Sequence, residues 1–266
     1  MKKAAFIVVL FLLIIPSQGQ SIEHYLTFAP QWSYLSNKDD LMSPLTYRGH
    51  HGALRTGYKR MNQKGTVNEV YGTFSLGYIQ SDIYPDFHSR ALSSMGEITY
   101  VRLVKMSDST LGFPVKFKMG INWHNQVYAK DNLRFTNNSF LMDFNSTLAI
   151  ASRLSNDFKL FNRNFSVNAN VSFALFNFIQ RPAYASSSPE SELSEDNNPV
   201  SAFLKSGKFE TIADYQQVMT ELNLIYYLKN GNGIRLRYGW LFAHYEEVSE
   251  MFEASHAISV STLFKL

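Results

Sequence analysis

Apolar and polar residues alternate along most of this chain with a period of two. In the clearest run, 164–173, every even position is Asn or Ser and every odd position is apolar. The apolar positions are Phe165, Val167, Ala169, Val171 and Phe173. Because successive side chains of a strand point to opposite faces, this run predicts a strand with one apolar and one polar face.

The same alternation predicts about ten strands. They cover residues 22–35, 52–61, 69–80, 95–106, 115–128, 140–152, 164–179, 216–228, 233–245 and 255–266. Segment 95–106 alternates least regularly, and the link 181–215 is long enough to contain a hairpin. Eight or twelve strands are therefore also compatible with the pattern.

The links between these segments fall into two length classes. Short polar links lie at 62–66, 107–112, 156–161 and 230–233, and longer links lie at 36–48, 81–94, 129–139, 181–215 and 246–254. Residues 230–233 read Asn-Gly-Asn-Gly, a strong signal for a tight hairpin. Short and long links in alternation predict an all-β transmembrane up-and-down barrel, with short periplasmic turns and long extracellular loops. A soluble all-β domain is the alternative.

The first 19 residues have the pattern of a secretory signal peptide. Lys2 and Lys3 precede the apolar run 4–16, and the small residues Ser17 and Gly19 fit a cleavage site before Gln20. The predicted domains are therefore a signal peptide, 1–19, and an outer-membrane barrel, 20–266. An uncleaved N-terminal membrane anchor is the alternative. The chain contains no Cys, which excludes a small disulfide scaffold.

Composition narrows the expected partners. The formal net charge is +3, so no strong attraction to nucleic acid follows. Phosphate-binding loops, Cys-based metal sites and zinc-binding His-Glu motifs are absent from the sequence. We therefore expect no cofactor. The expected partners are outer-membrane lipid and, as a possibility left open, another protein of the cell envelope.

The last predicted strand carries a family resemblance. Its alternating side chains are Ile258, Val260, Thr262, Phe264 and Leu266. This strand resembles the C-terminal signal of bacterial outer-membrane β-barrel proteins, although most members end on Phe or Trp rather than Leu. The Gln after the leader and the style of the strands resemble Bacteroidota members. The resemblance covers the mature chain and implies the outer membrane of a Gram-negative cell. It points to no subfamily, so it implies no site residues.

One pair of residues suggests catalysis. If the loop between segments 115–128 and 140–152 is centred near residue 133.5, His124 lies directly opposite Asp143 on the lumen side. A carboxylate beside an imidazole fixes its tautomer and raises its basicity, as in a hydrolase. The alternative is a self-satisfied polar pair in a wet lumen.

Histidines gather near the predicted outer end. Hairpin geometry predicts that His244 faces His256, close to the strand that begins at His50 and His51. Four imidazoles there are weak candidates for a metal site. The favoured interpretation is no metal, with imidazoles at the level of the lipid headgroups.

Five basic residues are predicted to face the lumen near its periplasmic end. They are Lys59, Lys116, Lys118, Arg235 and Arg237. They could form an anion-attracting mouth. We favour the alternative, in which they pair with Glu23, Glu69 and Glu221 inside a filled lumen.

Three functions follow from this reading. The leading hypothesis is a non-enzymatic structural or binding barrel. A narrow channel for small solutes and a lipid-directed hydrolase are the alternatives.

Overall fold

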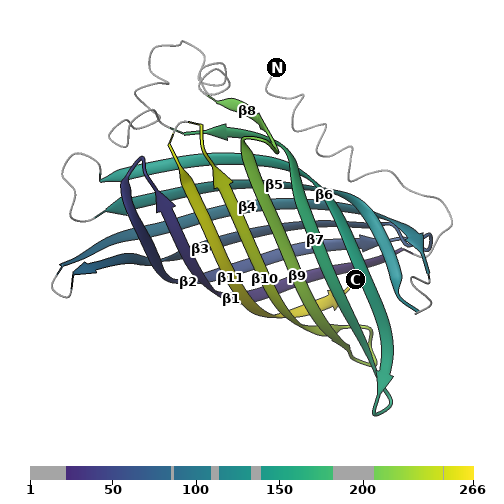
Figure 1. The fold of residues 1–266 in the computed structure, drawn as a ribbon. Helices are drawn as coiled ribbons and strands as arrows, with labels where there is room; N and C mark the ends of the chain where they lie inside the picture. Colours follow the sequence, from purple (N-terminus) through teal and green to yellow (C-terminus); the bar gives the residue numbers. More distant parts are fainter. Residues whose placement is uncertain (1–21, 85–86, 109–113, 133–138, 182–206, 248) are drawn as a thin grey trace, which may run out of the picture.

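The structure is a computed structural model that describes residues 22–84, 87–108, 114–132, 139–181, 207–247 and 249–266. The predicted leader, 1–19, lies outside the described residues. The described chain is built from strands (Figure 1). They are β1 (Glu23–Asp39), β2 (Ser43–Met61), β3 (Val67–Tyr84), β4 (Phe87–Ser107), β5 (Lys116–Asn132), β6 (Phe140–Leu160), β7 (Arg163–Gln180), β8 (Lys208–Thr211), β9 (Tyr215–Tyr227), β10 (Gly233–Tyr245) and β11 (Met251–Lys265).

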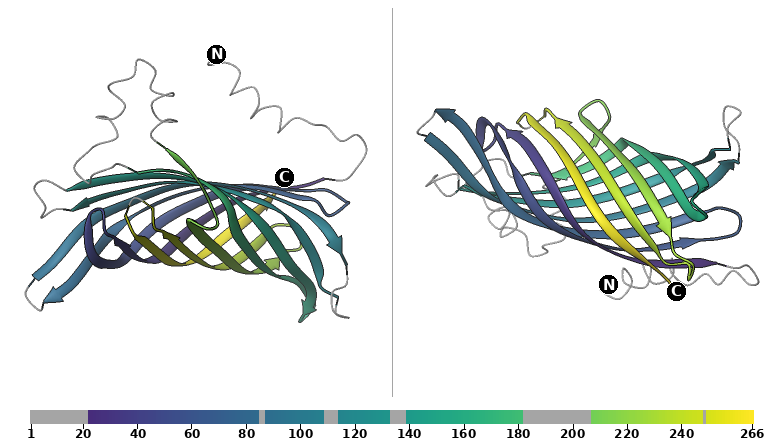
Figure 2. Two further views of the ribbon diagram at one scale, coloured as in Figure 1. Left: turned by 45° about the horizontal axis from the view of Figure 1, so that its top comes forward. Right: turned by 90° about the horizontal axis from the view of Figure 1, so that it is seen from below.

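Ten of these strands close into an antiparallel barrel. Each pairs with its neighbours in the chain, and β1 also pairs with β11, from Tyr25 opposite Lys265 to Asp39 opposite Met251. The pairs β6–β7 and β7–β9 complete the ring. The short strand β8 pairs with β7 outside this ring. The prediction of a ten-stranded up-and-down barrel is confirmed. In Figure 2 the tilted strands of the front and back walls cross each other.

The two ends of the barrel differ. The inner end carries both described chain ends and the links at 62–66, 161–162 and 228–232, while the outer end carries the links that follow β1, β3, β5, β7 and β10. The outer links are shorter than expected, because the strands continue into them. In the predicted link 36–48, β1 runs to Asp39 and β2 begins at Ser43. Charged residues at 38–40 break the alternation there, yet the inward side chains of Asn37 and Tyr47 are buried in the barrel.

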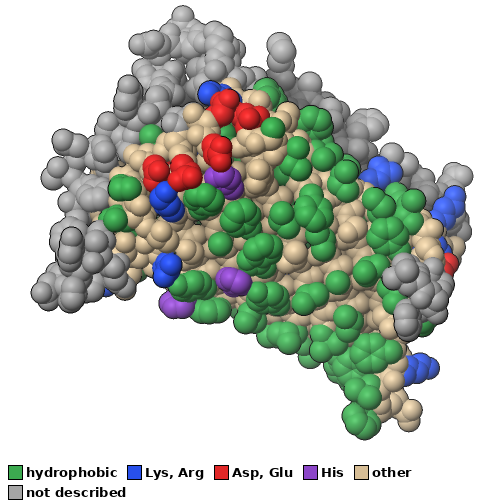
Figure 3. Space-filling model, viewed as in Figure 1, with side chains coloured by type: hydrophobic (Ala, Val, Ile, Leu, Met, Phe, Trp, Pro, Cys, Tyr) green, Lys and Arg blue, Asp and Glu red, His purple; other side chains and the backbone are tan. Residues whose placement is uncertain are grey.

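The outward face of the wall is apolar. Phe74 and Ile98, for example, expose 60% and 61% of their surface. In Figure 3 hydrophobic side chains are spread across the visible described face, and charged side chains gather near its margins. A closed barrel pairs its wall backbone and presents apolar side chains outward, as a bilayer requires. No helix in the described part of the chain is long and apolar enough to cross a membrane.

The described residues form four apolar clusters in the interior, two near each end. Near the inner end, Tyr25, Ile225 and Leu263 form one cluster, and Val67, Leu103 and Ala151 form another. The other two clusters lie near the outer end. Their members are Leu35, Tyr47, Ile79, Ala91 and Tyr128, and Ala174, Ile179, Tyr215, Ala243, Tyr245 and Met251. Charged and polar side chains occupy the space between the two ends.

Candidate functional site

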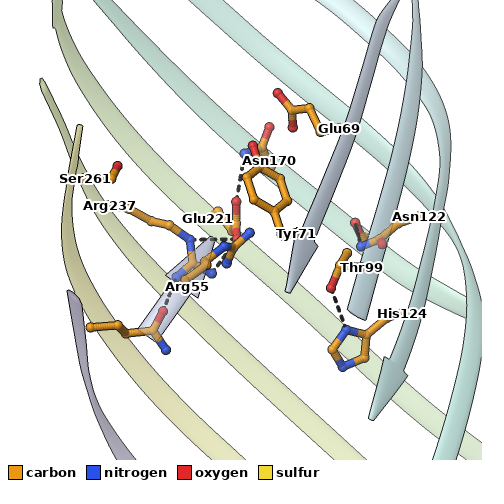
Figure 4. A network of polar contacts seen from close by, with 12 residues as sticks. Arg55, Glu69, Tyr71, Thr99, Asn122, His124, Asn170, Glu221, Arg237 and Ser261 are labelled. Carbon is orange, nitrogen blue, oxygen red and sulfur yellow. Dashed lines mark hydrogen bonds and ion pairs between the residues drawn. The ribbon is translucent and has the colours of Figure 1, made fainter. Parts of the chain in front are cut away.

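The inward face of the wall places charged side chains in the middle of the barrel. Strand alternation directs Arg55 of β2, Glu69 of β3 and Arg153 of β6 into the lumen, where all three are buried. Arg237 of β10 and Glu221 of β9 join them from the opposite wall (Figure 4). We call these five residues the central ion network. Isolated buried charges are costly, so the pairing of each charge decides whether the arrangement is stable.

Glu69 is held by two hydrogen bonds from one guanidinium group. Arg153 donates to both of its carboxylate oxygens, over 3.0 and 2.7 Å. This bidentate pair crosses the lumen from β6 to β3 and is the geometry that makes Arg–carboxylate pairs strong. The ammonium of Lys59 lies 3.9 Å from the same carboxylate. Glu69 therefore links two walls of the barrel that share no backbone hydrogen bonds.

Glu221 is shared by two arginines. Arg237 donates from Nε over 2.7 Å and also from Nη2, and Arg55 donates from Nη1 over 3.1 Å. Asn170 connects the two halves of the network, because it accepts from Arg153 and donates to Glu221 over 3.5 Å. The carboxylates of Glu69 and Glu221 are thus tied into one continuous set of contacts.

A cavity of about 120 Å³ lies beside this network. Its lining includes buried polar atoms that have no hydrogen-bond partner among the described residues. These atoms are Nε2 of His51, Nε of Arg55, Oδ1 of Asn122 and Nε2 of His124. A polar cavity of this size can hold several water molecules, which could satisfy these atoms. The lining side chains Arg55, Arg153 and Arg237 are matched in number by Glu69, Glu97 and Glu221, so the cavity carries no surplus charge.

His124 is buried and faces this cavity, but it does not lie opposite Asp143. The β5–β6 register places His124 opposite Thr147 and Asp143 opposite Tyr128. The predicted direct pairing is therefore wrong by four residues, or roughly 13 Å along the strand. Nδ1 of His124 lies 3.0 Å from the hydroxyl of Thr99 (Figure 4). Whether either residue takes part in catalysis stays a prediction, although they do not form the expected dyad.

Asp143 belongs to a second set of charges, which we call the outer ion network: Asp39, Lys130, Asp143 and Arg181. Asp39 accepts from Lys130 and Arg181, each over 2.5 Å, and all three side chains are almost fully buried. Asp143 lies 3.4 Å from Nε of Arg181, and neither of its oxygens has a hydrogen bond among the described residues. The outer part of the lumen thus contains buried charged groups beside the apolar clusters.

The predicted basic cluster is spread over three environments. Arg237 pairs with Glu221 and Lys59 approaches Glu69, as the filled-lumen interpretation expected. Arg235 is buried and donates to Ser261 and Tyr71, over 3.0 and 3.4 Å. Lys118 is also buried. Lys116, in contrast, lies at the inner rim and pairs with Asp157, over 2.7 Å, where both side chains are about half exposed.

The four candidate metal-binding histidines are not brought together. His51 points inward, whereas His50 points outward and stacks on Trp32. The predicted pairing of His244 with His256 is wrong by four residues, since His244 lies opposite Phe252 and His256 lies opposite Trp240. Among the described residues, the three potential ligands found close together are Glu210, Asp214 and Glu247, which include no histidine. Two of these three carboxylates are exposed.

Two members of the central ion network were missed by the sequence analysis. Arg55 alternates with Leu54 in a predicted strand, so its inward direction was available from the pattern. Arg153 falls one residue beyond the predicted strand 140–152, although β6 continues to Leu160. Continuing the alternation past residue 152 would have placed it in the lumen. Its pairing with Glu69 on a distant strand had no local signal.

Comparison with known proteins supports the architecture alone. No family model matches the chain, and no curated protein matches its sequence. The outer membrane protease OmpT from Escherichia coli matches with a TM-score of 0.54 and 6% identity, covering 94% of this chain and 99% of that one. The translocator domain of the autotransporter NalP from Neisseria meningitidis matches with a TM-score of 0.38 and 10% identity, covering 98% and 94%. The β domain of the Bordetella autotransporter BrkA matches with a TM-score of 0.34 and 11% identity, covering 90% and 98%.

The likeness to OmpT, together with the closed ring of strands and the apolar outward face, defines the fold class. The fold is that of bacterial outer-membrane β-barrel proteins.

Proposed function

We propose that this chain is an integral outer-membrane barrel of a Gram-negative cell that conducts no solutes and acts as a structural or binding component. The observation that carries this proposal is the filled interior. Apolar clusters lie near both ends of the lumen, and two ion networks lie between and beside them. A barrel of about this size is narrow enough for its own side chains to fill it.

The length of the strands supports a binding role at the outer end. A tilted strand crosses a bilayer with about 9–11 residues. Strands β4 and β6 each contain 21 residues, and β2 contains 19. The wall is therefore longer than a bilayer requires. We infer that its outer part projects from the membrane and presents a rigid surface to an envelope partner.

Conductance separates this proposal from the channel alternative. The wild-type protein in a planar bilayer, with insertion verified by protease protection, should give no unitary current steps. Two neighbouring residues provide a matched pair of variants: Thr99 lines the internal cavity, and Ile98 points outward. T99W and I98W should both be silent. Steady steps in the wild type that T99W reduces and I98W leaves unchanged would establish a channel through the lumen.

A measurement of fatty-acid release separates the non-enzymatic proposal from the hydrolase alternative. Purified protein in phospholipid vesicles should release no fatty acid above the background of empty vesicles. His124→Ala removes the buried imidazole, and Asn125→Ala truncates the next residue, on the opposite face of β5. Release by the wild type that His124→Ala abolishes and Asn125→Ala preserves would contradict the non-enzymatic proposal.

The export route is a separate part of the proposal. The leader 1–19 would direct the chain through the inner membrane and be removed before Gln20. N-terminal sequencing of protein recovered from an outer-membrane fraction tests this step. A mature chain starting at Gln20 supports it, and a chain retaining Lys2 and Lys3 in that fraction contradicts it. The resemblance to Bacteroidota members stays a prediction.

A further inference from the structure

The outward side chains of β2, β3 and β4 change character toward the outer end. On β2 the outward series runs from Leu54 through His50 to Arg48, and on β3 it runs from Phe74 through Tyr78 to Gln80. On β4 the corresponding outward residue is Arg90, which lies opposite Gln80. On β2 and β3 the outward positions thus change from apolar to aromatic and then to polar or cationic toward the outer end, and β4 carries a cationic residue at the same height. This order is typical of a wall that leaves the hydrocarbon and enters the headgroup layer.

A hollow of about 980 Å³ lies on this outward surface. Its lining includes Tyr34, Arg48, His50, Tyr78 and Gln80. The imidazole of His50 is held between Trp32 and Tyr34, with ring centroids 5.2 and 5.1 Å away. Opposite it on β3, the ring of Tyr78 is more than half exposed. The hollow therefore has an aromatic side toward the membrane and a polar side toward the outer end.

Arg48 lines the polar side of the hollow, and Arg90 lies next to it, opposite the lining residue Gln80. We call the hollow together with Arg90 the arginine hollow. Arg48 and Arg90 both face Gln80, from either side of β3. Two strand spacings put their backbones roughly 10 Å apart, so both guanidinium groups can reach one ligand. Arg90 lies 5.8 Å from the ring of Tyr78. Neither arginine has a carboxylate partner among the described residues.

The acidic side chains described on the flanking strands β1 and β5 form no ion pair with Arg48 or Arg90. Lys38 on β1 is engaged with both Asp40 and Glu250, over 3.4 and 2.6 Å. Asp131 on β5 lies opposite Leu92, which is two residues from Arg90 toward the inner end of β4. Arg48 in the hollow and Arg90 beside it are therefore two cationic groups without an ion pair to a described residue.

We propose that the arginine hollow binds a phosphorylated lipid of the outer leaflet. Its phosphate would accept hydrogen bonds from Arg48 and Arg90, while its acyl chains would lie along the apolar wall below Tyr78. Guanidinium groups suit phosphate because their donors form a planar fork. The occupant is a lipid rather than a soluble anion because the hollow opens directly above the apolar outward positions Phe74 and Leu76, which are exposed to the membrane. This inference rests on the membrane insertion that the proposed function includes. It does not depend on whether the lumen conducts solutes or whether the protein is an enzyme.

Lipid binding can be measured by native mass spectrometry of the intact barrel released from nanodiscs. The two probes are dioleoyl phosphatidic acid and dioleoylglycerol, which differ only by the phosphate group. We expect phosphatidic acid to be retained in preference to dioleoylglycerol. Each arginine near a membrane surface contributes about 1 kcal/mol, so the variant R48Q/R90Q should bind phosphatidic acid roughly 25-fold more weakly.

Arg102 provides the matched control. It also points outward from β4, but it lies toward the inner end and is remote from the hollow. R102Q should bind phosphatidic acid as the wild type does. Equal binding of both probes, an equal loss in R102Q, or no loss in R48Q/R90Q would overturn the proposal. Complete displacement by millimolar inorganic phosphate would also overturn it, since the ligand would then be a soluble anion.

Two further outcomes are distinguishable in the same spectra. A dimer that disappears in R48Q/R90Q would assign the hollow to a second copy of this chain and overturn lipid binding. Failure of the wild type to enter nanodiscs would contradict membrane insertion itself and hence the proposed function. Heat-dependent migration on gels, which reports a folded barrel, should be the same for wild type and both variants.

Discussion

The central and outer ion networks lie in the same lumen but satisfy their carboxylates differently. In the central network, Glu69 receives two hydrogen bonds from Arg153, and Glu221 receives donors from two arginines. In the outer network, Asp39 takes the donors of Lys130 and Arg181, and Asp143 has no hydrogen bond among the described residues. The central network therefore fixes the barrel, whereas Asp143 is a buried acid that the fold holds at a cost.

The largest expected effect is at Glu69. Glu69→Gln keeps the shape of the side chain but removes the charge that neutralises Arg153 and Lys59. Breaking one side of a buried ion pair costs about 3–5 kcal/mol, because the partner is left uncompensated. The free energy of unfolding, measured by urea titration in lipid vesicles, should fall by about this amount.

The control for Glu69 removes both partners. The double variant Glu69→Gln/Arg153→Met takes away the buried positive charge together with the acid. It should recover a large part of the lost stability, since a buried pair replaced by apolar side chains is often neutral. A single variant as stable as the wild type would show that the central network does not hold the walls together.

A smaller effect is expected at Asp143. Like Glu69→Gln, Asp143→Asn keeps the shape of the side chain and removes its charge, but in the outer ion network. Because this carboxylate has only one long contact, 3.4 Å from Arg181, and Arg181 keeps Asp39, little favourable interaction is lost. The free energy of unfolding should change by less than about 1 kcal/mol or should rise. A loss as large as that of Glu69→Gln would contradict the contrast between the two networks.

The smallest effect is expected at the surface. Lys208 of β8 pairs with Glu247 over 2.8 Å, where both side chains are about half exposed. The hydrogen bond from Lys208 holds the pKa of the Glu247 carboxyl below its usual range. Any stabilisation from this pair is thus present at neutral pH and disappears as the pH falls through that lowered pKa. Exposed pairs contribute little, so Lys208→Gln should leave the urea midpoint unchanged. A clear shift of that midpoint at neutral pH would show that the docking of β8 supports the barrel.

The sequence pattern predicts well which face of a strand each side chain lies on, but it predicts poorly the register between neighbouring strands. The expected pairings of His124 with Asp143 and of His244 with His256 are both displaced by four residues. An even displacement leaves every side chain on its predicted face, so the alternation contains no information against it. This is why the inward direction of His124, Asp143 and Arg237 could be predicted, while their partners could not.

The positions at which the strands end were also not predictable from the pattern. Polar residues near 36–48 resemble a loop because no apolar face continues through them. In the fold, backbone pairing continues at this height while the outward residues become polar, as expected if the wall leaves the hydrocarbon of the proposed membrane here. The Lys38 and Asp39 positions are strand for this reason. The outer ion network, which depends on Asp39 and on Arg181 from the far end of β7, had no signal in local sequence.

The central claim is that this wall has lipid on one side and a filled lumen on the other. Because the chain has no native Cys, single cysteines can be placed at each position from Gly72 to Tyr78 on β3 and spin-labelled without background. In lipid bilayers, the even positions should be accessible to oxygen from the membrane, and the odd positions should be shielded from both oxygen and a water-soluble nickel reagent. A profile without this period, or free access of the nickel reagent to Thr73 and Ser75, would contradict the account.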